Sequence, residues 1–132
     1  MSCALCHVPE QGFAAVEVGT SIGLEGRALR RNAPTLLNVA YVGQLFHDGR
    51  SGSLEQQAWD PLLNAIEMGN ADTASVLDVL RALPDYAGAF EAAFGHPADR
   101  ASLAAALASY ERTLVAKQFA STAGAMGARP AR

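Results

Sequence analysis

The sequence predicts a single all-α domain, and three observations support this prediction. Apolar residues in the second half of the chain recur at helical spacing, between residues that commonly cap helices. No segment alternates convincingly between apolar and polar residues, as a half-buried strand would. The length of 132 residues suits one domain with a modest core, and a content of 50% hydrophobic and 17% charged residues argues against a disordered chain.

The first half of the chain is expected to contain little regular structure. Residues 8–31 are rich in glycine and predict a long irregular loop, which is uncommon in a small domain unless the loop has a task such as wrapping a cofactor. A short helix is expected over residues 35–42. Ser53 with Gln56 predicts a capping box that opens a helix over residues 53–64, which Pro61 shortens or kinks.

The second half is expected to form three helices. Asp72 or Thr73 caps the first, whose apolar face carries Val76, Val79, Leu80 and Leu83. Pro84 ends it and starts the second, which Gly95 closes and which carries an aromatic stripe of Tyr86, Phe90 and Phe94. Asp99 opens the third, with one face formed by Leu103, Leu107, Tyr110 and Leu114. We expect residues 119–132 to be a disordered tail.

Charge and hydropathy exclude two classes of partner. The formal net charge is -3, so the chain presents no basic field for nucleic acid. No apolar run approaches the roughly 20 residues that a membrane span requires. We therefore expect neither nucleic-acid binding nor a membrane span.

Both cysteines belong to one motif, Cys3-Ala4-Leu5-Cys6-His7, which has the C-x-x-C-H spacing of c-type haem attachment. Two thiols on one helical turn can each bond a vinyl group of a flat macrocycle, and the next residue then directs its imidazole at the iron. A redox disulfide, half of a zinc site and chance are the alternatives. No βαβ pattern follows the motif and no second cysteine pair exists, so we expect one covalent haem c.

The chain start bears on localisation. Met1 and Ser2 directly precede the motif, so this sequence contains no signal peptide. Haem attachment of this type takes place outside the bacterial cytoplasm. We therefore expect a periplasmic protein whose start is truncated here.

Further motifs resemble those of the bacterial di-haem cytochrome c peroxidase family, which includes the MauG-like enzymes. They are RNAPTLLNVAY at residues 31–41, LFHDGRSGSLEQQA at 45–58 and PLLNAIEMG at 61–69, and the segment ASYERTL at 108–114 is similar to the family's domain-closing helix. The resemblance implies a cytochrome c-like helical domain, residues 1–118, wrapped around one covalently bound haem. It matches only the family's N-terminal domain, where peroxide reacts; a second, C-terminal haem domain is absent from this sequence.

The resemblance also assigns site residues. Cys3 and Cys6 would bind the haem covalently and His7 would ligate its iron. Glu67 aligns with the family's catalytic carboxylate and Gln57 with its companion glutamine. A carboxylate over the open haem face can relay a proton between the two oxygens of hydrogen peroxide, and an amide can hold the peroxide or a water in place.

Three other positions bear on the resemblance. Leu24 stands where several members have a histidine that caps the oxidised haem, and leucine cannot ligate iron. His47 replaces the tryptophan that is thought to help electrons cross between the haems. Asn32 matches a residue that helps bind calcium at the family's domain boundary, so a calcium ion is a weaker expectation.

Two functional classes remain open at this point. The chain is either a peroxidase-type haem domain that reduces hydrogen peroxide, or a mono-haem electron-transfer cytochrome with His7 and Met68 as axial ligands; an inactive truncated fragment is a third alternative. The first implies an external electron donor, which would be a small cytochrome c, a cupredoxin or a separate haem domain. It also leaves open whether enzyme activity requires the second haem domain.

Overall fold

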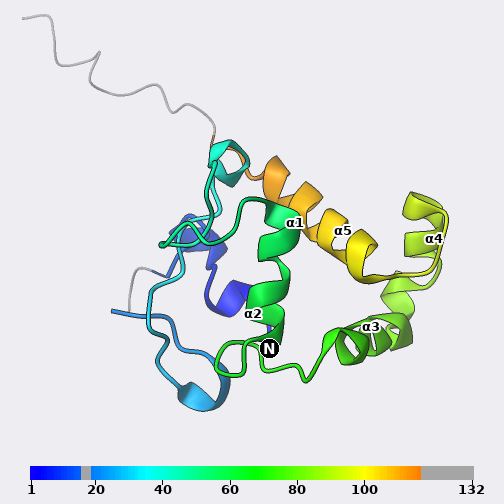
Figure 1. Cartoon of the computed structure of the whole chain (residues 1–132), viewed down its shortest axis with the longest axis horizontal. Coiled ribbons are helices and arrows are strands. Elements are labelled where there is room, and N and C mark those ends of the chain that lie inside the picture. The colour runs from blue at the N-terminus through cyan, green and yellow to red at the C-terminus, as the bar shows by residue number, and fades with distance from the viewer. Residues whose placement is uncertain (16–18, 117–132) are drawn as a thin grey trace, which may run out of the picture.

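A computed structural model of the chain describes residues 1–15 and 19–116 (Figure 1). Its α-helices are α1 (Leu54–Gln57), α2 (Trp59–Leu63), α3 (Thr73–Ala82), α4 (Ala89–Phe94) and α5 (Arg100–Thr113). Single 3-10 turns occur at Cys3–Leu5, Pro9–Gln11, Leu24–Gly26, Val39–Tyr41 and Pro84–Tyr86. Within the described ranges there are isolated β-bridges but no strand, so the predicted all-α class is confirmed.

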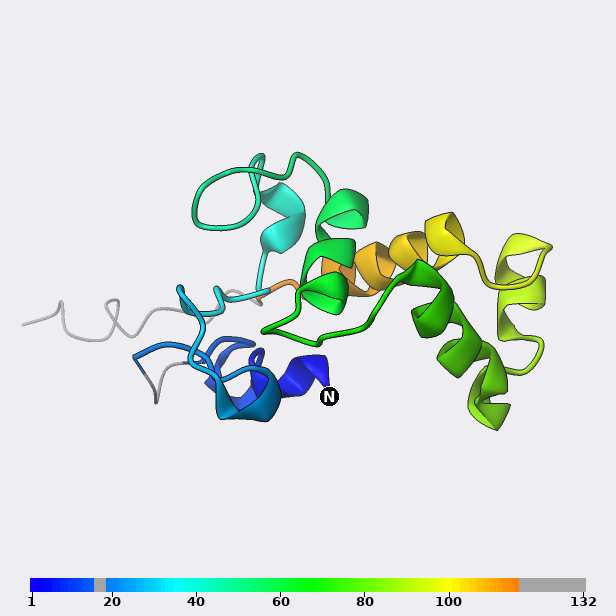
Figure 2. The ribbon, with the colours of Figure 1, turned by 60° about the horizontal axis from the view of Figure 1, so that its bottom comes forward.

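The helices form a central frame with loops on one side. In both ribbon views α3 and α4 lie on one side of α1 and α2, and the loops of the N-terminal third lie on the other (Figures 1 and 2). Helix α5 packs against α1 and the Val39–Tyr41 turn. None of the helices in the described ranges is long and apolar enough to cross a membrane. The predicted tail over residues 119–132 lies outside the described residues.

Two predicted helices in the first half are shorter than expected. The helix predicted over residues 35–42 is only the Val39–Tyr41 turn, because Asn38 adopts a left-handed conformation with φ of 61°. The helix predicted over residues 53–64 begins as expected, with the Ser53 side chain accepting a hydrogen bond from Gln56 N, but it divides into α1 and α2. Pro61 has no N–H to donate to the carbonyl of Gln57, which accounts for the division there.

In the second half, both predicted capping sites are confirmed. Asp72 and Asp99 form capping boxes with Ser75 and Ser102, at the starts of α3 and α5. The capping residue hydrogen-bonds the backbone three residues ahead, and the serine side chain returns the bond. These local bonds fix where each helix starts without any help from the core.

The prediction of one helix from Pro84 to Gly95 is wrong at its start. Gly88, with φ of 73°, separates the Pro84–Tyr86 turn from α4, so Tyr86 is not on the same helix as the two phenylalanines. The rings of Phe90 and Phe94 stack with centroids 5.7 Å apart. Gly95 closes α4 as predicted, also in a left-handed conformation.

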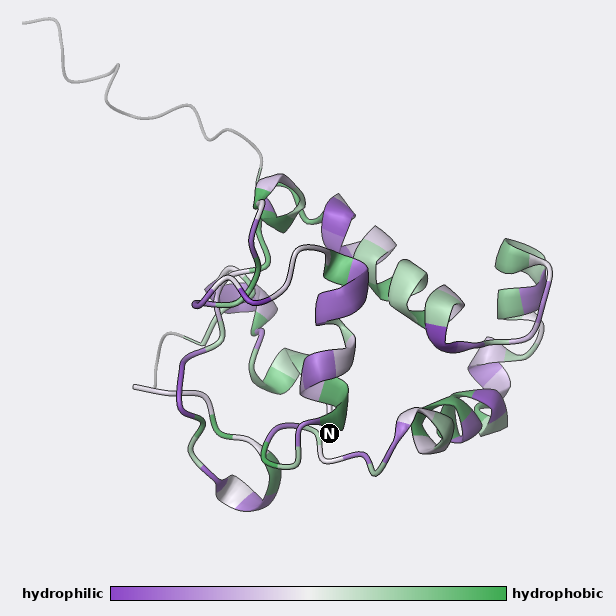
Figure 3. Ribbon diagram, viewed as in Figure 1, coloured by the Kyte–Doolittle hydropathy of each residue, from purple (hydrophilic) through white to green (hydrophobic). Residues whose placement is uncertain are grey.

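The buried face of α5 is formed by small residues. Ala108 is 0% exposed and Ala104 4%, whereas Tyr110, which we predicted to be on the buried face, is 56% exposed. Small side chains allow the close approach of α1 to α5, so the alanine face rather than the larger residues meets the helix. Figure 3 shows α5 as weakly hydrophobic along much of its length.

Two small hydrophobic clusters hold the helices together. One contains Leu45, Leu54 and Ala108, and the other contains Leu77, Phe90 and Ala98. Trp59 is 3% exposed, and its indole N–H donates to the carbonyl of Arg100 at 3.2 Å. This bond connects α2 to the start of α5. The N-terminal loops contribute little to either cluster.

Near the end of α5, Glu111 has one carboxylate oxygen that is buried without a hydrogen-bond partner among the described residues. Burial raises the pKa of Glu111, and Arg112 only partly opposes this effect. The unfolded chain keeps the ordinary, lower pKa, so Glu111 ionises there at a lower pH than it does in the folded state. The free energy of unfolding therefore falls as pH rises above the ordinary glutamate pKa, and it remains lower at neutral pH.

We predict that Glu111→Gln raises the free energy of unfolding at pH 7 by about 1 kcal/mol, because it removes a buried unpaired charge. The gain should largely disappear at pH 4, below the ordinary glutamate pKa, where the parent glutamic acid is mostly protonated in both states. Chemical denaturation of equally haem-loaded parent and variant at the two pH values measures this. Glu55→Gln is the control with opposite sign, because its hydrogen bond from Arg112 lowers the pKa of Glu55. A loss of stability in Glu111→Gln at pH 7 would contradict the prediction.

Candidate functional site

The thiols and imidazole of the C-x-x-C-H motif lie on a single tight turn. The backbone amides of Cys6 and His7 both donate to the carbonyl of Cys3, at 3.1 and 2.9 Å. The side chain of Ser2 accepts from Ala4 N and starts the turn. Both cysteines are free thiols; Cys3 is exposed and Cys6 is half-buried, and burial raises the pKa of the Cys6 thiol.

A loop over residues 8–14 orients His7. Its ends pair through a bridge between Val8 and Ala14, and Phe13 adopts φ of 59°, an uncommon conformation for a phenylalanine. The Nδ1 atom of His7 lies 3.0 Å from the carbonyl oxygen of Phe13. Since a carbonyl only accepts, Nδ1 is the donor in this contact, and Nε2 is the ring nitrogen that could ligate a metal. Metal-ligating histidines are commonly held in this way.

The residues at this turn fit a c-type haem. They offer two free thiols, an imidazole oriented through its Nδ1 atom, and apolar side chains beside them. Leu5, between the thiols, is 62% exposed, and Ile22, whose carbonyl is 3.8 Å from Cys6 Sγ, is 45% exposed. A flat apolar macrocycle bound to the cysteines could cover both.

Glu67 follows α2 in a turn over residues 64–69. The side-chain amide of Asn64 donates to Glu67 Oε1 at 2.9 Å. Glu67 is half-buried, and burial raises its pKa, although the positive charge of Arg50 and the Asn64 hydrogen bond oppose the rise. His7 and Cys6 lie within electrostatic range of this carboxylate. The structure therefore brings Glu67 near the motif turn, although sixty positions separate them in sequence.

The Leu24 loop lies directly against the Glu67 turn. The Leu24 amide donates to the carbonyls of Ile66 and Glu67, at 3.0 and 3.1 Å. A Cβ on Gly69 would lie 2.4 Å from Leu24 Cδ2, so the two segments are in close contact. Leu24, which stands where several family members have a ligating histidine, therefore packs its apolar side chain on the turn that carries Glu67.

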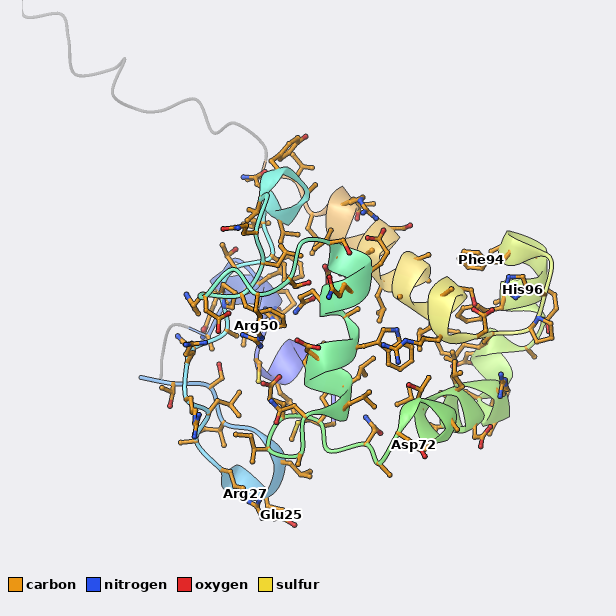
Figure 4. The ribbon with its side chains drawn as sticks, viewed as in Figure 1. Glu25, Arg27, Arg50, Asp72, Phe94 and His96 are labelled. Carbon is orange, nitrogen blue, oxygen red and sulfur yellow. The ribbon has the colours of Figure 1, made fainter. Side chains whose placement is uncertain are left out.

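Charged residues connect the sequence motifs around this site. Asp48 forms ion pairs with Arg31 at 2.6 Å and Arg50 at 2.9 Å, and the two arginines lower the pKa of Asp48 to about 2. The guanidinium of Arg50 also lies 3.4 Å from the centre of the Phe46 ring and 3.5 Å from Asp60. Arg50 lies beside α2 (Figure 4), where its charge reaches Glu67.

The candidate Gln57 and the two other histidines of the sequence make no hydrogen bond to the motif turn or to Glu67 among the described residues. Gln57 ends α1, is half-buried, and its side chain makes no hydrogen bond to the described residues. His47 donates from Nε2 to the carbonyl of Asn32 at 3.1 Å. His96 lies at the far end of the molecule, next to Phe94 (Figure 4).

The Asn32 side chain is engaged within the protein. Its Oδ1 accepts from the Ser21 hydroxyl at 2.9 Å and from Ala33 N at 3.0 Å, and its amide donates to the Ala15 carbonyl. Ser21 is 1% exposed, so this is a buried network that joins three loop segments. The described residues contain no group of three or more His, Cys, Asp or Glu suited to a metal ion. The calcium expectation stays untested.

Sequence reasoning missed Phe13 and Asn64 as site residues. No sequence signal could identify Phe13, because its backbone carbonyl rather than its side chain orients His7. Asn64 could have been found, since an asparagine at a helix end, three positions before a carboxylate, is well placed to bond both the turn backbone and the acid.

The tight turn with two thiols and an oriented histidine, on an all-helical frame, defines a cytochrome c-type haem domain. The family model for di-haem cytochrome c peroxidase matches residues 1–124. The chain belongs to this family, whose cofactor is haem c.

Individual relatives agree with this assignment. The chain is 38% identical over 118 residues to a methylamine utilization protein MauG of Methylophilus methylotrophus, and 36% identical over 118 residues to a cytochrome c551 peroxidase of Pseudomonas aeruginosa. Each match covers 87% of this chain and 34% of the relative, so the chain spans about a third of these proteins.

Solved structures give the same result. A MauG-like protein associated with microbial copper homeostasis matches with a TM-score of 0.79 and 33% identity, over 88% of this chain and 35% of the other. The diheme peroxidase BthA from Burkholderia thailandensis matches with a TM-score of 0.75 and 31% identity, over 85% and 33%.

We predict that Gly23→Ala disturbs the site, because a Cβ at this position would lie 1.9 Å from the carbonyl oxygen of Ile66. Relief of that overlap must move the Leu24 loop away from the Glu67 turn and should cost about 1–3 kcal/mol of unfolding free energy. Thermal or chemical unfolding of the holoprotein measures the loss. Gly19→Ala, in the same loop with nothing within 4 Å of its Cβ, is the matched control. Equal stability of the two variants would contradict the close approach.

Proposed function

We propose that residues 1–118 form a haem domain in which Cys3 and Cys6 bind one haem c covalently and His7 Nε2 ligates its iron. The free thiols on one turn and the protonated Nδ1 of His7 support this proposal. A domain that receives haem in this way is expected to work in the periplasm, because haem attachment of this type takes place outside the bacterial cytoplasm. The weaker calcium expectation is not part of the proposal, since Asn32 is engaged with protein groups.

We further propose that the domain reduces hydrogen peroxide, with electrons from an external donor. The single observation that carries this proposal is the half-buried Glu67, whose pKa is raised by burial and which lies within electrostatic range of His7. A bound haem c would supply the redox-active iron for this chemistry. The donor would be a small cytochrome c, a cupredoxin or a separate haem domain.

The role of Glu67 follows from the proton balance. Reduction of hydrogen peroxide to two waters consumes two electrons and two protons, and cleavage of the O–O bond requires a proton on the departing oxygen. The Glu67 carboxylate can take a proton from one oxygen and return it to the other. A pKa above the ordinary glutamate value suits this relay, because the group must both accept and release a proton near neutral pH.

Two neighbours would support this proton transfer. The side-chain amide of Gln57, which makes no hydrogen bond to the described residues, could hold the peroxide or a water in place, as the resemblance suggests. Leu24 offers no ligand for the iron, and its backbone bonds keep its loop on the Glu67 turn. We therefore expect the iron to react in the oxidised protein without a prior reductive step.

We predict that Glu67→Gln slows the reaction of oxidised holoprotein with hydrogen peroxide by roughly 10²-fold or more, because the amide keeps the shape but cannot accept the proton. Stopped-flow absorption spectroscopy measures the rate. The parent rate should fall as pH drops through a pKa above the ordinary glutamate value, and the variant should lack this dependence. Glu91→Gln, on the exposed surface of α4, is the matched control.

Equal rates in the parent and Glu67→Gln would refute the relay. An unreactive parent with the low-spin spectrum of His–Met ligation would instead indicate the electron-transfer alternative, with Met68 as the sixth ligand.

A further inference from the structure

One residue, Asn64, both shapes the turn that carries Glu67 and contacts its carboxylate. The Asn64 backbone carbonyl accepts hydrogen bonds from Glu67 N at 3.0 Å and Gly69 N at 2.9 Å. Its side-chain Oδ1 accepts from Ile66 N at 3.1 Å, and its Nδ2 donates to Glu67 Oε1 at 2.9 Å. The turn therefore folds around Asn64, and the carboxylate is bonded to the same side chain.

The orientation of the Asn64 amide is fixed by its partners. A backbone N–H can only donate, so the Asn64 atom that faces Ile66 must be the oxygen; the amide nitrogen then faces Glu67. Both contacts require the same orientation. The side chain is half-buried, which further limits its movement.

We propose that Asn64 is a positioning residue for Glu67, holding one carboxylate oxygen so that the other faces the proton to be transferred. The proposal rests on the proposed peroxide function. Among the described residues, no other side chain or backbone group hydrogen-bonds the Glu67 carboxylate. Three rotatable bonds separate that carboxylate from the backbone, so without Asn64 it would lose its defined position.

The backbone and the side chain of Glu67 are held by different groups. The Leu24 amide bonds the carbonyls of Ile66 and Glu67 from outside the turn, which fixes the backbone. Asn64 Nδ2 fixes the carboxylate. A change at the Asn64 amide nitrogen therefore releases the carboxylate while the Leu24 contacts stay in place, and a small misplacement of a reacting group can cost up to about 10²-fold in rate.

Asn64→Asp tests the proposal, because it keeps the oxygen that accepts from Ile66 N and replaces the donor to Glu67 by an acceptor. We expect the peroxide reaction of the holoprotein to slow by roughly 10- to 100-fold. The affinity of the reduced protein for carbon monoxide, which needs no proton transfer, should be about unchanged. Asn70→Asp is the matched control: its Nδ2 donates to the Leu62 carbonyl at 2.8 Å and not to Glu67, so the rate should stay near that of the parent.

The double variant shows whether Asn64 acts through Glu67. In the Glu67→Gln background, Asn64→Asp should cause no further loss of rate, because the carboxylate that it positions is already gone. A further loss as large as in the parent background would overturn the proposal. So would equal rates for Asn64→Asp and Asn70→Asp.

A readout independent of activity is the side-chain amide resonance of Asn64, in the diamagnetic carbon monoxide complex of the reduced holoprotein. Glu67→Gln should shift this resonance and speed its hydrogen exchange, and should leave the Asn70 amide unchanged. An Asn64 amide that does not respond would overturn the proposal. If the parent fails to react with peroxide while the Asn64 amide responds as expected, the proposed function fails and the Asn64–Glu67 interaction stands.

Discussion

The small number of large buried side chains is the constraint on which the rest of this structure depends. Of the ten hydrophobic residues that are buried in the described ranges, five are alanines, and only Ala15 and Leu45 come from the first fifty positions. Across the whole of the described ranges, eleven large hydrophobic residues are exposed. Alanine buries little area, so packing alone provides limited stability to the N-terminal loops. A covalent haem would supply the missing apolar body, and the bound form would then be much more stable than the free chain.

Packing holds the helices together, whereas hydrogen bonds hold the loops in place. The same hydrogen bonds also position the site residues. The Phe13 carbonyl orients His7, and the Leu24 amide fixes the Glu67 turn. The first bond is local to one loop, whereas the second joins segments that are far apart in the chain. The geometry of the proposed relay and the stability of the loops are therefore coupled, so a substitution that shifts the Leu24 loop will affect both. Leu24 makes this contact through its backbone amide, and its apolar side chain cannot ligate iron.

The sequence predicted helix ends well where residues within a single turn determine them. The caps at Asp72 and Asp99 and the closing Gly95 are set within one turn; the sequence predicted Asp99 and Gly95 correctly, and it placed the other cap at Asp72 or the next residue. Predictions that depended on long-range packing were less accurate. Tyr110 is exposed because α1 approaches the alanine face of α5. The helix expected over residues 35–42 is interrupted at the left-handed Asn38, whose amide donates to the distant carbonyl of Leu114 at 2.8 Å. At the site, sequence identified the chemical groups, but not the backbone carbonyl or the Asn64 amide that orient them.

The intact mass of the denatured holoprotein, matured with a periplasmic haem-attachment system, tests the central claim most directly. If Cys3 and Cys6 bind one haem through thioether bonds, the denatured chain will be heavier by the mass of one haem, and a variant with both cysteines replaced by alanine will not be. A denatured parent chain with the mass of the polypeptide alone would contradict the account, because the proposed ligation by His7 and relay by Glu67 both depend on that haem.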